Sequence, residues 1–282
     1  MDQGNRLVEY YDRNTPKFLR FGGGRKAAAI HRALWTPGVQ NKTQALLYTN
    51  HLVAEAIRPA LENIHDPHLL DLGCGVGGTA LYVAQHLGAR VTGLTISPVQ
   101  AQIAAQRASE LGLGERCRFL VADFLSPPEI EPAQAAYAIE SFSHVGDEPM
   151  FFHQASRLLV PGGRLILCDD FLSETRLPHI EPNRQKWVDR FRQGWRLESL
   201  IASEQATQLA KDAGFTLLEN TDLTPLIRLP HPAILPLLKL ISAIPLHSPY
   251  WGSLSGGIAL QVCQKMGWVK YYLLVLQKEF ST

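Results

Sequence analysis

The sequence predicts an α/β protein built on a seven-stranded, mostly parallel sheet with helices on both faces and a helical cap. From Leu69 onward, short apolar runs alternate with longer segments whose apolar residues recur every three or four positions. A glycine-rich loop, residues 73–78, follows the first apolar run. The chain has 282 residues, 46% of them hydrophobic, which is enough for one large core and does not require two independent domains.

The apolar runs predict the strands in chain order. They are expected at residues 68–72, 90–94, 118–121, 135–140, 163–168, 215–219 and 271–277. The segments between them carry helical periodicity, and helices are expected at residues 79–87, 98–111, 148–159 and 203–213. Ser97 and Pro98 suit the start of the second helix, and Gly214 suits the end of the last. Right-handed crossovers would join the parallel strands.

Three segments lie outside this alternation. Residues 1–65 are expected to form an N-terminal lid and a helix, at residues 39–63, and residues 66–282 form the sheet domain. Cap insertions are expected at about residues 174–201 and 223–257, after the carboxyl ends of strands, where open α/β sheets bind ligands. The second insertion is apolar but broken by prolines, which argues against a transmembrane helix. It suits a lipophilic pocket wall, a peripheral membrane contact or a simple hydrophobic cap.

Charge and cysteine usage limit the partners. The formal charge of +1 comes from 27 basic and 26 acidic residues without a long block of either sign, so a nucleic-acid partner is not expected. The four cysteines lack CxxC spacing, and residues 1–14 lack the apolar core of a signal peptide. These features predict a reduced, cytoplasmic protein and leave its oligomeric state open.

The glycine loop predicts a nucleotide-like ligand. Gly73, Gly75 and Gly78 satisfy the GxGxxG spacing, which serves several nucleotide cofactors because glycines permit a tight turn at a helix N-terminus. Gly77 belongs to the same loop, and we expect it to contact the cofactor together with Gly73 and Gly75. Asp71, two residues before the loop, suits a cationic ammonium group and not a pyrophosphate.

Two further positions separate the possible cofactors. A dinucleotide site needs an acid about 20 residues after the loop, and residues 93–97 offer none. Asp123 and Phe124 close the third strand with a carboxylate beside an aromatic ring, which suits the amine and the ring of adenine. Together with Asp71 they favour S-adenosylmethionine as the cofactor.

The run from Leu94 to Gln102 resembles the post-glycine segment of tocopherol-type and sterol-type C-methyltransferases, and is similar to that of cyclopropane fatty acid synthases. Glu140, Ser141 and His144 match the family's Glu-Ser-x-x-His segment, and Tyr10-Tyr11-Asp12 resembles the start of sterol methyltransferases. The resemblance implies a class I S-adenosylmethionine-dependent methyltransferase with a Rossmann-like fold over residues 66–282. It also implies that Thr95 and Gln100 hold the ribose hydroxyls.

Methyl transfer needs few catalytic side chains, because the protein mainly aligns the acceptor and excludes water. Glu140 and His144, at the end of the fourth strand, are the candidate proton acceptors. Alternatively, Glu140 holds the methionine end of the cofactor or caps a helix, and His144 is an ordinary loop residue. Asp169 and Asp170 could face the acceptor, cap a helix or hold a divalent metal for a diphosphate or catechol acceptor. Because further ligands at metal-binding spacing are missing, no metal is expected.

The acceptor is expected to be small and lipophilic; the resemblance implies a terpenoid, a prenylated aromatic or a related natural product, methylated at carbon. The aromatic residues expected around it are Tyr10, Tyr11, Phe21, Phe142, Trp187 and Phe191. Their faces could stabilise a cationic intermediate. The alternatives are an O- or N-methyltransferase acting on a phenol or alkaloid, and a cofactor-bound cyclase that no longer transfers methyl groups.

Overall fold

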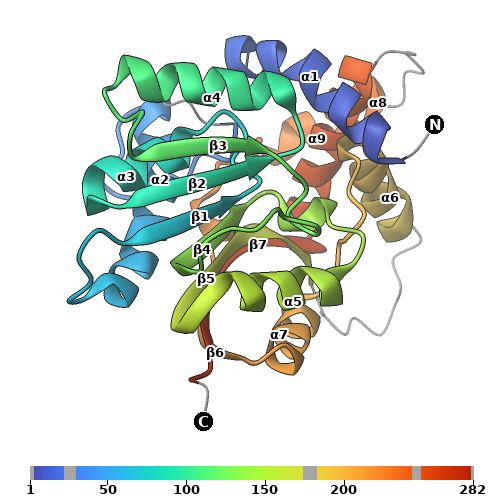
Figure 1. The fold of residues 1–282 in the computed structure, drawn as a ribbon. Coiled ribbons are helices and arrows are strands. Elements are labelled where there is room, and N and C mark those ends of the chain that lie inside the picture. The colour runs from blue at the N-terminus through green and yellow to red at the C-terminus, as the bar shows by residue number, and fades with distance from the viewer. Residues whose placement is uncertain (1–2, 22–29, 174–182, 243–248, 281–282) are drawn as a thin grey trace.

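The computed structural model describes residues 3–21, 30–173, 183–242 and 249–280. Within these ranges one sheet of seven strands forms the centre of the molecule, in the order β3-β2-β1-β4-β5-β7-β6 (Figure 1). The strands are β1 (His68–Leu72), β2 (Arg90–Thr95), β3 (Cys117–Val121), β4 (Ala133–Ile139), β5 (Leu159–Leu172), β6 (Phe215–Asp222) and β7 (Val269–Lys278). β1 to β5 run parallel, whereas β7 is antiparallel to both β5 and β6. The predicted fold class is confirmed.

Helices cover both faces of this sheet (Figure 1). One face carries α2 (Lys42–Ile57), α3 (Gly78–Leu87) and α4 (Pro98–Glu110), and the other carries α5 (Glu148–Leu158) and α7 (Ser203–Asp212). α4 begins as predicted, because the Ser97 side chain accepts a hydrogen bond from the Gln100 backbone N–H. Short 3₁₀ turns lie at Arg58–Leu61, Phe142–His144, Thr224–Leu226 and Pro232–Ile234.

α2 is shorter than the helix expected over residues 39–63. It begins after Asn41, whose side chain accepts a hydrogen bond from the Gln44 backbone N–H. It ends at Ile57, and the 3₁₀ turn that follows contains Pro59. Proline lacks a backbone N–H, so the α-helical hydrogen bonding cannot continue through it.

The core lies on both faces of the sheet, so the central strands are buried on both sides, as expected for parallel strands covered by helices. All five residues of β1 are buried. Leu69 packs in the cluster that includes residues of α2 and α3, and its neighbour Leu70 packs in the cluster that includes residues of α5 and α7. This two-sided packing fixes the carboxyl ends of the strands in place.

A helical cap lies at the carboxyl ends of the parallel strands. It consists of α1 (Gln3–Phe21), α6 (Arg184–Trp195), α8 (Leu235–Ser242) and α9 (Pro249–Lys265), which gather at one end of the sheet (Figure 1). α1, a 19-residue helix that contains Pro16, was not expected from the sequence. No helix in the described part of the chain is long and apolar enough to cross a membrane.

The two principal cap helices, α6 and α9, meet through glycines. A Cβ atom on Gly194 would lie 2.6 Å from the Gly256 Cα and 2.6 Å from the Gly252 carbonyl oxygen. The backbones therefore approach more closely than any side chain would allow. This contact places Trp195, the last residue of α6, beside Ser253 of α9, and the Trp195 indole N–H donates to the Ser253 carbonyl oxygen at 3.0 Å.

Candidate active site

A cavity of about 940 Å³ lies between the cap and the carboxyl ends of the strands. Its volume is near the upper end of the range usual for small-molecule sites, about 300–1,000 Å³, so it has room for a cofactor together with an acceptor. Its wall is built from the ends of β1, β2, β4 and β5, the loops after β1, β2, β3 and β4, and residues of α1, α6 and α9. These are the positions at which open α/β sheets bind ligands.

The glycine loop forms one end of the cavity. Gly73 and Gly75 line it, with backbone φ of +94° and +51°, a region that glycine adopts without strain. No described heavy atom lies within 4 Å of the position a Cβ would occupy on Gly75, so the loop leaves space there for a ligand. Gly77 does not line the cavity, which corrects the expected cofactor contact. Its Cβ would lie 2.8 Å from the Ala104 Cβ, so this glycine permits close packing between the loop and α4.

Asp71 lies beneath the loop at the cavity floor. Its side chain is almost fully buried, and none of the described Lys, Arg or His side chains forms an ion pair with it. Burial raises the pKa of Asp71 to about 8. A buried carboxylate that faces a cavity without a cation beside it fits the ammonium group of an amino-acid ligand.

Thr95 and Gln100 lie side by side at the end of β2 and the start of α4, and both line the cavity. The Thr95 hydroxyl donates to Gln100 Oε1 at 2.8 Å, and Gln100 Nε2 donates to the hydroxyl of Thr15 in α1 at 3.1 Å. The Gln100 amide therefore keeps one N–H and one acceptor position for a ligand. That capacity fits a ribose diol.

Asp123 and Phe124 line the cavity after β3. The Asp123 carboxylate accepts a hydrogen bond from the Leu125 backbone N–H at 2.9 Å, which orients it and leaves its second oxygen for a ligand. The Phe124 ring packs edge-on against Phe151, with ring centroids 5.7 Å apart. The pair offers a hydrogen-bond acceptor beside an apolar face, as an adenine ring requires.

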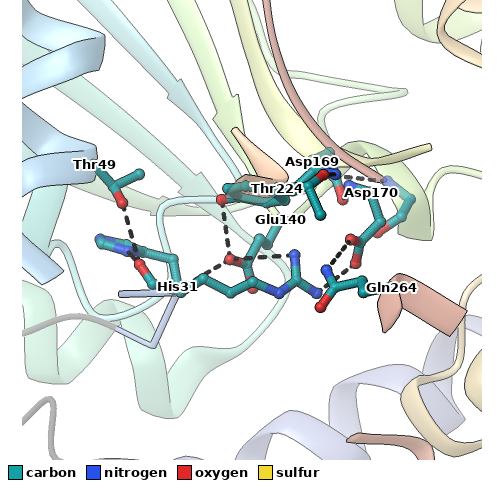
Figure 2. Close-up of polar contacts among 10 residues, drawn as sticks. His31, Thr49, Glu140, Asp169, Asp170, Thr224 and Gln264 are labelled. Carbon is teal, nitrogen blue, oxygen red and sulfur yellow. Dashed lines mark hydrogen bonds and ion pairs between the residues drawn. The ribbon is translucent and has the colours of Figure 1, made fainter. Parts of the chain in front are cut away.

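Glu140 follows β4 in the left-handed backbone region, with φ of +51°, which is uncommon for a residue with a side chain. Its Oε1 atom accepts from the Arg32 backbone N–H at 2.7 Å and from the Tyr271 hydroxyl at 3.1 Å (Figure 2). The guanidinium of Arg32 lies 3.8 Å from the same oxygen. Glu140 therefore joins the segment before α2 to β4 and β7.

Asp169 and Asp170 lie near the carboxyl end of β5 and belong to the same polar network as Glu140 (Figure 2). Asp170 forms an ion pair with Arg32 and accepts from Gln264 Nε2 at 3.5 Å, while Asp169 accepts the backbone N–H groups of Ser143 and Asp170. Burial raises the pKa of Asp169 to about 6 and that of Asp170 to about 7. The described residues contain no group of three or more His, Cys, Asp or Glu side chains arranged to hold a metal ion.

His144 lies on the 3₁₀ turn after Glu140, and its ring faces α1 across the cavity. Its Nε2 atom is 2.9 Å from the Tyr11 hydroxyl, and its Nδ1 atom is 3.1 Å from the Arg196 carbonyl oxygen. Burial lowers the pKa of His144, so the imidazole is neutral at pH 7. A neutral imidazole on a cavity wall is a suitable proton acceptor.

The aromatic residues expected around the acceptor divide into two groups. Tyr10 and Tyr11 of α1 line the cavity. Phe142, Trp187 and Phe191 do not, which corrects the expectation: Phe142 packs in the core with the rings of Phe151, Phe152 and Phe171, and the other two pack between α6 and α9. The side chain of Phe21, at the end of α1, lies outside the described part of the structure.

The residues expected to contact a ligand did not include Arg32, Trp195 or Ser253, although Trp195 lies in the cap insertion expected at about residues 174–201. Trp195 and Ser253 line the cavity, and Arg32 lies behind it with its guanidinium 4.7 Å from the Tyr271 ring centroid and 5.4 Å from that of Trp195. No local motif marks Arg32. A signal for the other two was present, since Gly194 directly precedes Trp195, and Gly252 and Gly256 flank Ser253 with the four-residue spacing of a close helix contact.

The chain is similar to several known methyltransferases. Residues 69–163 match the family described as a methyltransferase domain. Sterol 4-C-methyltransferase strm-1 of Caenorhabditis elegans is 36% identical over 114 residues, 40% of this chain and 34% of that protein. An O-methyltransferase of Pyrenophora dematioidea is 30% identical over 205 residues, 72% of this chain and 73% of that protein.

Among solved structures, the [4+2]-cyclase SpnF is 27% identical, with a TM-score of 0.75 over 98% of this chain and 96% of that chain. The present chain spans 34 to 59% of the length of three curated relatives that it matches. The region matched by the methyltransferase-domain family, residues 69–163, contains the glycine loop and the ends of β1 to β4, which line the cofactor half of the cavity.

Proposed function

Because this chain belongs to the class I S-adenosylmethionine-dependent methyltransferases, we propose that it methylates a small lipophilic acceptor, a terpenoid, a prenylated aromatic or a related natural product, at carbon. The observation that carries the proposal is the cavity itself. The glycine loop and Asp71 line the same space as Glu140, His144 and Tyr11.

The cofactor half of the cavity fits S-adenosylmethionine, the cofactor of this family. Asp71 would hold the ammonium group, Thr95 and Gln100 the ribose, and Asp123 with Phe124 the adenine. When bound, the cofactor supplies an electrophilic methyl group on a sulfonium. The chain's own contribution is to orient the acceptor against that group and to keep water away.

The acceptor half combines apolar surface with polar and charged side chains. Leu7 and Val8 of α1, Leu254 of α9 and the Trp195 ring supply apolar surface. An alkene acceptor would become cationic on methylation, and aromatic faces such as Trp195 stabilise a cation by about 0.5–2 kcal/mol each. The proton lost afterwards would go to a group at the end of β4. The sterol C-methyltransferase similarity supports attack by carbon.

O-Methylation is the second candidate. It is favoured by the O-methyltransferase similarity, which covers more of the chain than the sterol enzyme does. The neutral His144 imidazole would serve a phenol or hydroxyl acceptor as well as a carbon acceptor. A cofactor-bound cyclase is the third possibility, in keeping with the likeness to SpnF.

Product analysis with S-adenosylmethionine carrying a ¹³C-methyl group tests these candidates. The purified protein would be incubated with a panel of geraniol, farnesol, squalene, a prenylated hydroquinone, a simple phenol and an alkaloid amine. The proposal expects a new methyl carbon bonded to carbon in ¹³C NMR, with one S-adenosylhomocysteine formed for each methyl transferred. A methoxy or N-methyl product would favour the second candidate. Acceptor conversion without S-adenosylhomocysteine release would favour the cyclase.

A further inference from the structure

Two side chains from distant parts of the sequence form a polar pair inside the cavity. Tyr11 belongs to α1 and His144 to the turn after β4, and the hydroxyl oxygen is 2.9 Å from the imidazole Nε2. Both residues line the cavity. Their pairing therefore exists only while α1 stays over the ends of the strands.

The other imidazole nitrogen determines the direction of this hydrogen bond. Nδ1 lies 3.1 Å from the Arg196 carbonyl oxygen, and a carbonyl oxygen can only accept. Nδ1 therefore carries the hydrogen in the neutral ring, which leaves a lone pair on Nε2. The Tyr11 hydroxyl must donate to that lone pair. Its own oxygen lone pairs remain available to a molecule in the cavity.

Glu140, the other candidate proton acceptor, is held differently. Its Oε1 atom already accepts from the Arg32 backbone N–H and the Tyr271 hydroxyl and lies 3.8 Å from the Arg32 guanidinium. These contacts tie the carboxylate to β7 and to the segment before α2. Glu140 lines the cavity, but these contacts hold its Oε1 atom and give the carboxylate a positioning role.

We propose that Tyr11 takes the proton from the methylated acceptor and passes its own hydroxyl proton to Nε2 of His144. This inference rests on the proposed function and identifies its base. For a cationic intermediate, a C–H bond breaks and its electrons form the new C=C bond, while the proton forms a bond to the Tyr11 oxygen. The original Tyr11 O–H bond breaks, and its proton forms an N–H bond on His144. For a hydroxyl acceptor, the bond that breaks is O–H.

The surroundings suit this transfer. The groups facing the pair are Glu140 at the end of β4, Asp169 of β5, Tyr10 of α1 and the backbone of Arg196. Burial lowers the pKa of His144, so the ring is neutral before transfer, whereas the nearby Glu140 charge favours the imidazolium formed afterwards. Burial raises the pKa of Tyr11, which keeps it a phenol. Tyr11 thus conducts a proton without becoming a stable anion.

A test that needs no acceptor is ¹⁵N NMR of protein labelled at histidine, with S-adenosylhomocysteine bound. The His144 signals are assigned by their loss in His144→Gln. We expect a protonated Nδ1 and an unprotonated Nε2 that accepts a hydrogen bond, with the Nε2 signal shifted in Tyr11→Phe and unshifted in Tyr10→Phe. A protonated Nε2 at neutral pH, or an Nε2 signal insensitive to Tyr11→Phe, overturns the proposal.

The second test measures kcat as a function of pH, with any acceptor that the product analysis shows to be methylated. Tyr11→Phe and His144→Gln should each lower kcat about 10²- to 10⁴-fold, the usual contribution of a positioned proton-transfer group. Both should remove the fall in kcat on the acid side that protonation of His144 causes. Tyr10→Phe is the matched control, since it removes the neighbouring hydroxyl of α1, which bonds to Ser253 of α9 and not to His144. It should change KM and keep the acid-side fall.

The two proposals fail in different ways. An acceptor methylated at oxygen or nitrogen, or no methylated acceptor at all, contradicts the proposed C-methylation and leaves the NMR test to decide on the relay. Equal losses of kcat in Tyr10→Phe and Tyr11→Phe, or an acid-side fall that persists in His144→Gln, contradict the relay whatever the acceptor is.

Discussion

Asp71 makes cofactor binding depend on pH in a defined direction. In the ligand-free protein, burial raises the pKa of this carboxyl to about 8, so at pH 6 to 7 it holds a proton. An ammonium group beside it favours the carboxylate, and its pKa falls in the complex. Binding must therefore release close to one proton below pH 8. The affinity is lost as pH falls, because the proton competes with the ligand.

The magnitude follows from that linkage. With one proton released, Kd rises tenfold, about 1.4 kcal/mol, for each unit that pH falls below about 7.5. Calorimetry with S-adenosylhomocysteine at pH 5.5, 6.5 and 7.5, in two buffers of different ionisation enthalpy, measures both Kd and the protons released. Asp71→Asn should bind more weakly at pH 8 and show a much flatter pH dependence. Asp169 and Asp170, with pKa values of about 6 and about 7, also titrate in this pH range. Because both are present in the wild type and in Asp71→Asn, the difference between the two proteins reports on Asp71. A wild-type protein that releases no proton, or a variant with the same slope, would refute the reasoning.

Three further predictions concern the cap and the core. Gly256→Ala would place a Cβ 2.8 Å from the Trp195 ring. We therefore expect the free energy of unfolding in urea to fall by about 1–3 kcal/mol and the acceptor KM to rise. In the control Gly252→Ala, the added Cβ meets no described atom within 4 Å, so both quantities should stay at their wild-type values. Phe142→Ala should cost about 3–5 kcal/mol of stability with cofactor Kd unchanged, and a normal unfolding midpoint would show that the ring is not in the core. Arg32→Met leaves buried carboxylates unpaired and should destabilise the protein by about 3–5 kcal/mol; unfolding at the wild-type urea concentration would contradict that account.

Local patterns predicted the sheet well because each strand has its own apolar run. β1 was predicted at its observed bounds, and α4 was marked by its Ser97 cap. β5 runs from Leu159 to Leu172 and is longer than predicted at both ends. Its last residues, 169–172, pair with β7, more than 90 positions away in the chain, and its first residue, Leu159, pairs with Ala133 of β4. Such pairing leaves no periodic signal inside the strand. α1 was missed for a similar reason, since it is held by contacts to α4 and α9.

The residues expected to hold the cofactor could be picked out from the sequence because they lie at or near the ends of consecutive strands, and all of them except Gly77 line the cavity. The residues around the acceptor were only partly predictable: Tyr10 and Tyr11 were expected and line the cavity, whereas Trp195 and Ser253 come from separate segments that only the folded chain brings together. Phe142 shows the difference clearly. It lies within the segment that carries Glu140 and His144, yet the 3₁₀ turn directs its ring into the core. A motif identifies which residues are near one another, but the local backbone decides which of them face the ligand.

α1 touches both halves of the cavity at once. The Gln100 amide donates to Thr15 on the cofactor side, the Ser97 hydroxyl donates to Asp12, and Tyr11 bonds to His144 on the acceptor side. A stiff helix cannot release one of these ends while keeping the other fully engaged. Both products should therefore leave through one shared opening movement, and a single slow step would then limit steady-state turnover. Burst kinetics, with a fast first turnover followed by a slower steady rate, would be the sign of it.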